Sequence, residues 1–214
     1  MFAVSSYKEI ERIEKEKCSK HLIAVLFVRP NSRDADEIIK DFEYLHYRTG
    51  EAFSIYAAGY TNDFDCAYKE NYRKVTTCTG SDWYYSAKDY SDFVRNLAGR
   101  IKNWTYGGNI EILLFQGHES DNSCFDFRNY ISINITYGIK SGYISSFSSF
   151  MESMINHVED AISGAETLLT PTGKIKIREV VEASLKDCND TLIPIKDVMK
   201  NRHFYKIPSV DIVL

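Results

Sequence analysis

The residues best placed to bind a ligand form one short segment: Arg29, Asn31, Ser32 and Arg33. This segment follows the apolar run 21–28, which predicts a buried strand, and it precedes a predicted helix capped by Ser32. A helix N-terminus offers unpaired N–H groups, and each arginine can make paired bonds to phosphate or carboxylate. The segment therefore predicts an anion-binding site. The alternative is a plain helix cap with surface charge, in which Asp34 and Asp36 neutralise the arginines.

A second polar group follows the third predicted strand, 109–116, and consists of His118, Glu119, Asp121 and Cys124. A histidine beside carboxylates can act as a general base or ligate a metal. A metal site needs three or four protein ligands, and the spacing supplies no complete set. We therefore expect a polar surface loop here, and no metal site is predicted.

A third polar group follows the second predicted strand, 52–60, and consists of Asn62, Asp63 and Asp65. Its oxygen atoms could bind a cation, but Asn and Asp are also favoured in turns, where they bond their own backbone. We favour the turn. His46 lies late in a predicted helix, where a cationic side chain suits the helix C-terminus, and this suffices to explain it. No catalytic residue and no cofactor is predicted.

The cysteines argue against dithiol chemistry. The chain has five cysteines: Cys18, Cys66, Cys78, Cys124 and Cys188. Their number is odd, their spacing is wide, and no two of them form a CxxC pair. We expect reduced, mostly buried thiols. The usual nucleotide motifs are missing as well, because no GxGxxG follows the first strand and GxxxxGK[ST] occurs nowhere.

Composition is that of a soluble globular protein, with 44% hydrophobic and 26% charged residues in a chain of 214. Such a chain can bury a full core, most often in one main domain. A net charge of −4 argues against a protein that binds duplex nucleic acid, which usually carries a basic stripe. Residues 1–20 contain no signal-peptide core, and the apolar run 22–28 is too short to span a bilayer. We therefore expect a cytoplasmic protein with no membrane association.

Hydrophobic periodicity predicts strands and helices that alternate along the chain. Strands are expected at 21–28, 52–60, 109–116 and 130–139, with a short one near 74–78. Helices are expected at 6–19, from Ser32 to Gly50, from Ser86 to Gly107, over 147–162 and around 175–185. Ser6 with Glu9 and Ser86 with Asp89 make capping boxes.

The helix over 147–162 carries a wide stripe of Phe, Met, Ile and Val side chains. Such a stripe can form a binding surface, but we favour core packing. The chain as a whole is expected to divide into an N-terminal helical appendage at 1–20, an α/β core domain at 21–163, and a C-terminal extension at 164–214 that packs on the core.

The order strand, helix, strand, helix, strand, strand, helix over 21–163 resembles the thioredoxin fold. The resemblance implies an α/β fold with a central mixed sheet of about four strands flanked by helices. Two motifs of that family are absent: Arg29-Pro30-Asn31-Ser32 stands at the place of the CxxC, and Tyr106-Gly107-Gly108-Asn109 at the place of the cis-proline. The scaffold is therefore expected to be redox-inactive. The stretches 42–60 and 83–115 also resemble uncharacterised bacterial proteins, which supplies no function.

The competing fold is a Rossmann-like, all-parallel sheet, which needs a helical crossover before each parallel strand. The link between Phe115 and Tyr130 has no helical pattern, so we predict an antiparallel hairpin there. The distinction matters for the sites. With the third strand antiparallel to the first, His118 and Ser32 lie at opposite ends of the sheet, whereas an all-parallel sheet would bring them to one edge.

Two functions remain open from the sequence. The first is a non-catalytic binding or protein-interaction protein, whose partner is another protein, as a component of a bacterial multi-protein defence or stress system. The second is a small enzyme or sensor that acts on an anionic ligand, such as a nucleotide, at the end of the first strand. We favour the first, because no combination of nucleophile and base and no metal-ligand set appears.

Overall fold

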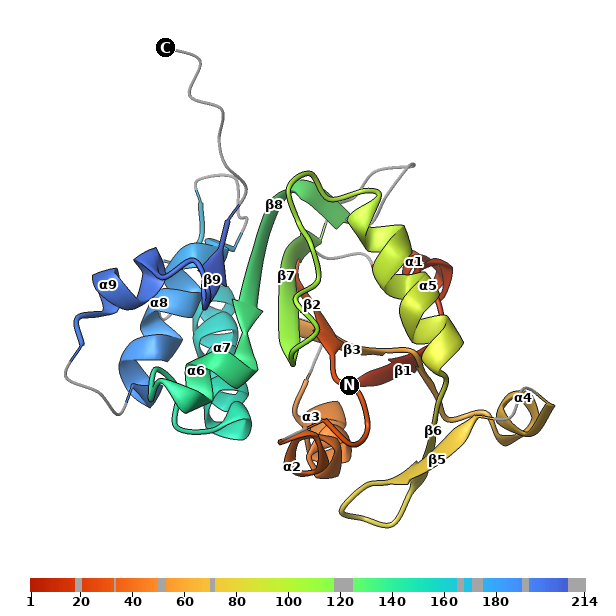
Figure 1. The fold of residues 1–214 in the computed structure, drawn as a ribbon. Coiled ribbons are helices and arrows are strands. Elements are labelled where there is room, and N and C mark those ends of the chain that lie inside the picture. The colour runs from red at the N-terminus through yellow and green to blue at the C-terminus, as the bar shows by residue number, and fades with distance from the viewer. Residues whose placement is uncertain are drawn as a thin grey trace.

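The computed structural model describes residues 1–17, 21–32, 34–49, 53–69, 72–117, 125–164, 168–170, 175–189 and 193–207, with the side chains of 66, 67 and 69 excepted. Its main feature is a six-stranded mixed sheet in the order β1-β3-β2-β7-β8-β9 (Figure 1). The strands are β1 (Phe2–Val4), β2 (Leu22–Phe27), β3 (Phe53–Ala58), β7 (Glu111–Gly117), β8 (Phe125–Asn134) and β9 (Tyr205–Lys206).

The strand directions make the sheet mixed. β1 and β2 both run parallel to β3, whereas β7 is antiparallel to β2, β8 to β7, and β9 to β8. The predicted antiparallel pairing of the third and fourth strands is therefore confirmed. The sheet has six strands where about four were expected, because β1 and β9 come from the short segments at either end of the chain and add one strand to each edge.

The central strand β2 is buried on both faces, as its continuous apolar sequence predicts. Leu22, Ala24 and Leu26 belong to one core cluster, and Ile23, Val25 and Phe27 belong to the other. Helices cover both faces, so the architecture is α/β (Figure 1).

One face of the sheet packs against α1 (Tyr7–Lys15) and α5 (Ala87–Ala98). The other face packs against α2 (Ala35–Lys40), α3 (Phe42–Arg48), α7 (Phe147–Ser163) and α8 (Ile177–Cys188). Two short helices, α6 (Ile135–Lys140) and α9 (Ile195–Lys200), lie beside α7 and α8 (Figure 1). Six apolar side chains of the predicted 147–162 stripe are buried, which confirms the core interpretation; Ile162 is exposed.

A second, three-stranded sheet projects from the main body next to α4 (Phe64–Lys69) (Figure 1). Its strands are β4 (Tyr60–Thr61), β6 (Asp82–Tyr85) and β5 (Arg73–Thr76), in that order. The short strand expected near 74–78 is β5, and its partner β6 is an element that the sequence did not indicate.

Four local predictions were wrong. The single helix expected from Ser32 to Gly50 is two helices, α2 and α3, joined at Asp41. The N-cap of α2 is Asp34, whose backbone is in the left-handed region (φ 69°), rather than Ser32. Ser6 is an N-cap without a side-chain bond, and Glu9 instead accepts from Ser5. The strand expected at 130–139 ends at Asn134, whose side chain caps α6 by accepting from the Tyr137 N–H.

The Ser86 cap was correct, since its hydroxyl accepts from the Asp89 N–H at 3.1 Å. The helix it opens ends earlier than expected, at Ala98. Within the described part of the chain, no helix combines the length and apolar character needed to cross a membrane.

Candidate functional site

The segment predicted to bind an anion lies at the carboxyl end of β2, where Arg29 is exposed. The Arg29 guanidinium sits over two aromatic rings, 4.9 Å from the centroid of Tyr90 and 5.5 Å from that of Tyr106. Cation–π contacts at these distances attract the guanidinium to the ring face. The arginine is therefore held in place by aromatic rings rather than by a carboxylate.

The two rings come from different elements and are joined to each other. Tyr90 lies on α5, Tyr106 lies in the loop before β7, and the Tyr90 hydroxyl donates to the Tyr106 oxygen at 2.6 Å. The Tyr106 hydroxyl in turn donates to the Asn109 carbonyl at 2.8 Å. Burial raises the pKa of both phenols, so both stay neutral in the physiological range and Arg29 keeps its positive charge.

Gly59 allows Tyr90 to reach this place. It has φ +80°, and a Cβ added to it would lie 2.7 Å from the Tyr90 Cβ. Its backbone connects neighbouring elements, because its N–H donates to the Val4 carbonyl and its carbonyl accepts from the Ser86 N–H. The close approach of β3 and the start of α5 therefore requires a residue without a side chain here.

The turn after Arg29 differs from the predicted helix cap. The Ser32 N–H and hydroxyl both donate to the Arg29 carbonyl, at 3.1 and 2.8 Å, so both donors are used within the turn. Asn31 adopts a left-handed backbone (φ 69°), and its side-chain oxygen accepts from the guanidinium of Arg73 at 2.7 Å. Arg73 lies on β5, and it brings a second guanidinium to this turn.

Neither Arg29 nor Arg73 has a carboxylate within salt-bridge distance among the residues described. Asp34 and Asp36, which could have neutralised the arginines, make no ion pair with Arg29. Arg33 lies outside the described residues. We define the cationic cluster as Arg29 and Arg73 with Asn31, Tyr90 and Tyr106. Two exposed guanidinium groups that pair with no carboxylate of the described residues can bind phosphate or carboxylate through charge-assisted hydrogen bonds.

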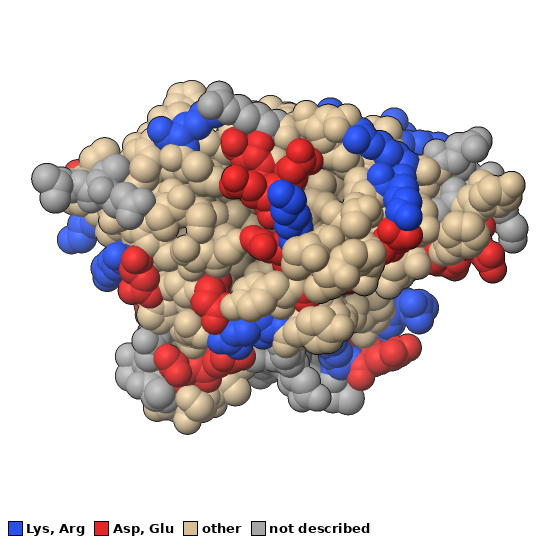
Figure 2. All heavy atoms as spheres, turned by 90° about the horizontal axis from the view of Figure 1, so that it is seen from below, with Lys and Arg blue, Asp and Glu red and all other residues tan. Residues whose placement is uncertain are grey.

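Elsewhere, positive and negative side chains lie close to one another on the surface. On the face in Figure 2, acidic and basic side chains are interspersed among uncharged ones. Local pairs of opposite charge include Arg48 with Glu152 and Glu159, and Lys74 with Asp82. The cationic cluster contrasts with these pairs, because neither of its arginines has such a partner in the part of the chain that the structure describes.

The other predicted polar groups do not join this cluster. Asp63 accepts from the Asp65 N–H at 2.9 Å at the start of α4, which is the turn chemistry that we favoured over cation binding. His46 Nδ1 lies 2.7 Å from the Met1 carbonyl oxygen, in the last turn of α3. In the described ranges, no group of three or more His, Cys, Asp or Glu side chains is arranged to hold a metal ion.

The group from His118 to Cys124 lies outside the described residues. β7 ends at Gly117 beside His21, whereas Glu111 at its start pairs with Phe27. β7 therefore ends at the opposite end of the sheet from Arg29. Of the cysteines, Cys78 is exposed and Cys188 is buried, and the side chains of Cys18, Cys66 and Cys124 are not described.

Comparison with protein-family models, with curated proteins and with solved structures found no match to this chain.

Sequence reasoning missed Arg73, Tyr90 and Tyr106, which lie far from Arg29 in the chain. The one sequence signal that could have indicated aromatic contacts is the tyrosine content, 15 Tyr among 214 residues, but it does not say which of them meet an arginine. Only the packing of α5, the 99–110 loop and β5 against the end of β2 brings these side chains together.

Proposed function

We propose that the protein is a non-catalytic binding protein on a redox-inactive thioredoxin-like scaffold, and that the cationic cluster recognises an anionic group of a partner protein. One observation carries the proposal. The exposed Arg29 guanidinium is held over Tyr90 and Tyr106 with no carboxylate in reach among the described residues. A preorganised, uncompensated guanidinium loses little side-chain entropy when it binds an anion.

The scaffold part of the proposal is supported by strand directions. β2 and β3 are parallel and joined through helices, and β7 and β8 form an antiparallel hairpin that leads to α7. The third strand of this core runs antiparallel to the first, as the thioredoxin resemblance implies. The redox-inactive part is supported by Arg29-Pro30-Asn31-Ser32 at the place of the family's dithiol.

Two features favour a protein partner over a free small ligand. The cluster lies on an exposed turn, and none of its five residues lines a described cavity. Arg73 reaches it from the projecting three-stranded sheet, so a partner that contacts the cluster would also meet that sheet. A free nucleotide remains the second candidate, because the same two arginines would suit its phosphates.

The test uses the double variant Arg29→Ala/Arg73→Ala. Loss of both guanidinium groups is expected to weaken partner binding by about 2–4 kcal/mol, at roughly 1.5–3 for each charge-assisted bond before non-additivity. Arg100→Ala is the matched control, because its exposed guanidinium also lies over a tyrosine ring, 4.5 Å from the centroid of Tyr7, outside the cluster. A separate Arg33→Ala variant tests the remaining predicted residue.

The measurement is affinity capture from the native host followed by calorimetric titration of the recovered partner, with ATP and pyrophosphate titrated in parallel. Weaker binding by the double variant, with Arg100→Ala unchanged, supports the proposal. If ATP alone shows the difference, the ligand is a nucleotide; equal binding by all variants contradicts an anion site here.

The redox-inactive part has its own assay. Purified protein is expected to show no reductase turnover on insulin disulfides, and replacement of all five cysteines by serine is expected to leave partner binding intact. Dithiol turnover by the wild-type protein would contradict it.

A further inference from the structure

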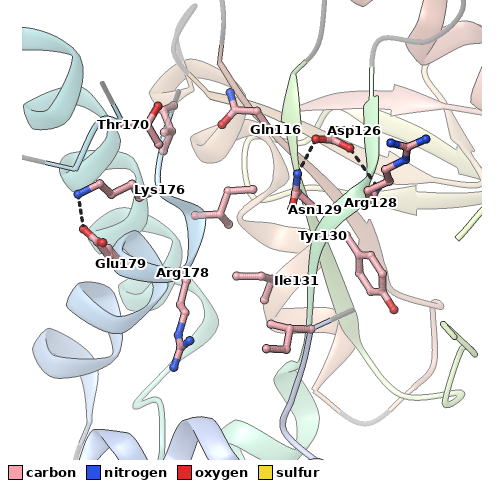
Figure 3. Close-up of a pocket in the computed structure, with 13 residues that line it drawn as sticks. Gln116, Asp126, Arg128, Asn129, Tyr130, Ile131, Thr170, Lys176, Arg178 and Glu179 are labelled. Atoms are coloured by element: carbon pink, nitrogen blue, oxygen red, sulfur yellow. Dashed lines mark hydrogen bonds and ion pairs between the residues drawn. The ribbon is translucent and has the colours of Figure 1, made fainter. Parts of the chain in front are cut away.

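A cavity of about 430 Å³ lies at the other end of the sheet from the cationic cluster (Figure 3). Its walls are the end of β7, the first half of β8, and the segment that leads into α8. Gln116 marks its place on the sheet, because Gln116 pairs with Leu22 at the start of β2, whereas Arg29 follows the end of that strand. The volume lies within the range of small-molecule sites.

The interior of this cavity is apolar. Ile131 of β8, Ile177 at the start of α8 and Ile175, two residues before that helix, line it and are themselves buried. Ile207, which is 47% exposed, also lines it. An apolar interior of this kind favours an uncharged ligand body, because burying an unpaired charge here would be costly.

Two pairs of charged or polar groups around the cavity are already joined. Lys176 Nζ lies 3.2 Å from Glu179 Oε2, and Asp126 accepts from the Asn129 side chain at 2.6 Å. Figure 3 shows the guanidinium of Arg178 extending away from the cavity. The charges therefore do not converge on the interior.

One polar atom in the cavity wall lacks a partner. Gln116 is 4% exposed, and its Nε2 donates to the His21 carbonyl at 3.3 Å, but its Oε1 has no hydrogen-bond partner among the residues described. The carbonyl of His21 can only accept, so it fixes which end of the amide is the nitrogen. The amide faces the cavity across from Thr170 (Figure 3). Buried acceptors without a partner are rare in folded proteins.

We propose that this cavity binds a small, uncharged molecule with an apolar ring-sized body and one N–H or O–H group, which donates its hydrogen to Gln116 Oε1. The apolar walls enclose the body, and the unpaired oxygen selects for the donor. This site is separate from the cationic cluster, and the proposal does not depend on the proposed function.

The test compares 2-naphthol with 2-methoxynaphthalene, which share a ring system and differ in the hydrogen that naphthol can donate. Wild-type protein is expected to bind 2-naphthol about five- to tenfold more tightly, the difference expected for one hydrogen bond. Gln116→Leu is expected to remove that preference while retaining binding of the ether. Affinities are measured by the change in probe fluorescence on titration with protein.

Two further variants locate the site. Ile207→Trp is expected to weaken both probes at least fivefold by filling part of the cavity, and its exposed position makes the substitution compatible with folding. Ile162→Trp is the matched control, because Ile162 is 49% exposed on α7 and lines no described cavity. It is expected to bind both probes as the wild type does.

A measurement on the wild-type protein covers the case in which Gln116→Leu does not fold. Addition of 2-naphthol is expected to shift the side-chain amide resonances of Gln116 in a ¹⁵N-correlated NMR spectrum, and the ether is expected to shift them less. The proposal is overturned if neither probe binds, if both bind equally to the wild type, or if Gln116→Leu keeps the preference.

Discussion

A buried carboxylate on α1 offers the sharpest test of how this fold is held together. Glu14 is 4% exposed, and its carboxylate contacts His21 Nε2 and accepts from the Tyr56 hydroxyl. Lys17 Nζ lies 3.8 Å from the same carboxylate and donates to Ser54 Oγ at 2.6 Å. This polar network joins α1 to β3 and to His21, the residue that precedes β2.

Removing both members of the Glu14–His21 pair should cost less than the two single removals added together. Glu14→Leu removes the buried carboxylate that His21 and the Tyr56 hydroxyl both contact, and His21→Leu leaves that carboxylate buried without the imidazole. Each is expected to lower the free energy of unfolding by about 3–5 kcal/mol. The double variant, which replaces the pair by apolar groups, is expected to cost less than the sum by roughly 1–3 kcal/mol.

Urea unfolding monitored by tryptophan fluorescence measures these differences, because Trp83 and Trp104 are both buried in the folded protein. Costs that add within about 0.5 kcal/mol would show that Glu14 and His21 are not coupled. A cost below about 1 kcal/mol for Glu14→Leu alone would refute the buried network as a source of stability.

The same carboxylate gives a pH dependence of known sign. Burial alone would raise the pKa of Glu14, but the hydrogen bond and charge of His21, with the Tyr56 hydroxyl and Lys17, outweigh it and hold the pKa below its ordinary value of 4.5. The stabilisation is therefore complete above that value and is lost as pH falls through the lower, folded-state pKa. The stability difference between wild type and Glu14→Leu should shrink on acidification; a difference that grows would contradict the argument.

Three further substitutions test packing. Met154→Asp places an unpaired charge in the core beneath α7. This change should unfold the protein, because its cost of several kcal/mol approaches the whole free energy of unfolding. A variant whose circular dichroism spectrum shows that it is folded would refute the core assignment. Tyr205→Phe removes a buried hydroxyl that has no hydrogen-bond partner among the described residues, and it should leave urea stability unchanged or raise it by up to about 1 kcal/mol; a clear loss would reveal a missed partner. Gly59→Ala adds a Cβ at φ +80°, against the Tyr90 Cβ, and should lower the free energy of unfolding by about 1–3 kcal/mol. An unchanged melting temperature would show that the backbone around Gly59 moves to accommodate the methyl group.

The sequence alone determined the elements whose burial is dictated by their own residues. The run 22–27 is apolar at both odd and even positions, so it can only be a strand with both faces covered, and β2 is such a strand. The stripe of α7 repeats at helical spacing over four turns, and its core role follows from that spacing. The missing helical pattern after Phe115 similarly required an antiparallel return, which β8 makes.

Tertiary structure decided where several elements end. The alternation of isoleucines continues from Ile131 through Ile139, but β8 stops at Asn134 because that side chain caps α6. Gly138 then lets this short helix approach Phe204, whose ring would lie 2.6 Å from an added Cβ. No pattern within 130–139 records the position of Phe204, so periodicity extended the strand too far.

Tertiary structure also decided the composition of both candidate sites. The sequence determined that Arg29 follows a buried strand, because local pattern is enough to end that strand. It did not determine that Tyr90, Tyr106 and Arg73 surround the turn, since each lies on a separate element and reaches it only when the sheet and α5 have packed. The unpaired oxygen of Gln116 is likewise invisible in the sequence, because whether a side chain finds a hydrogen-bond partner depends on every neighbour that folding brings to it.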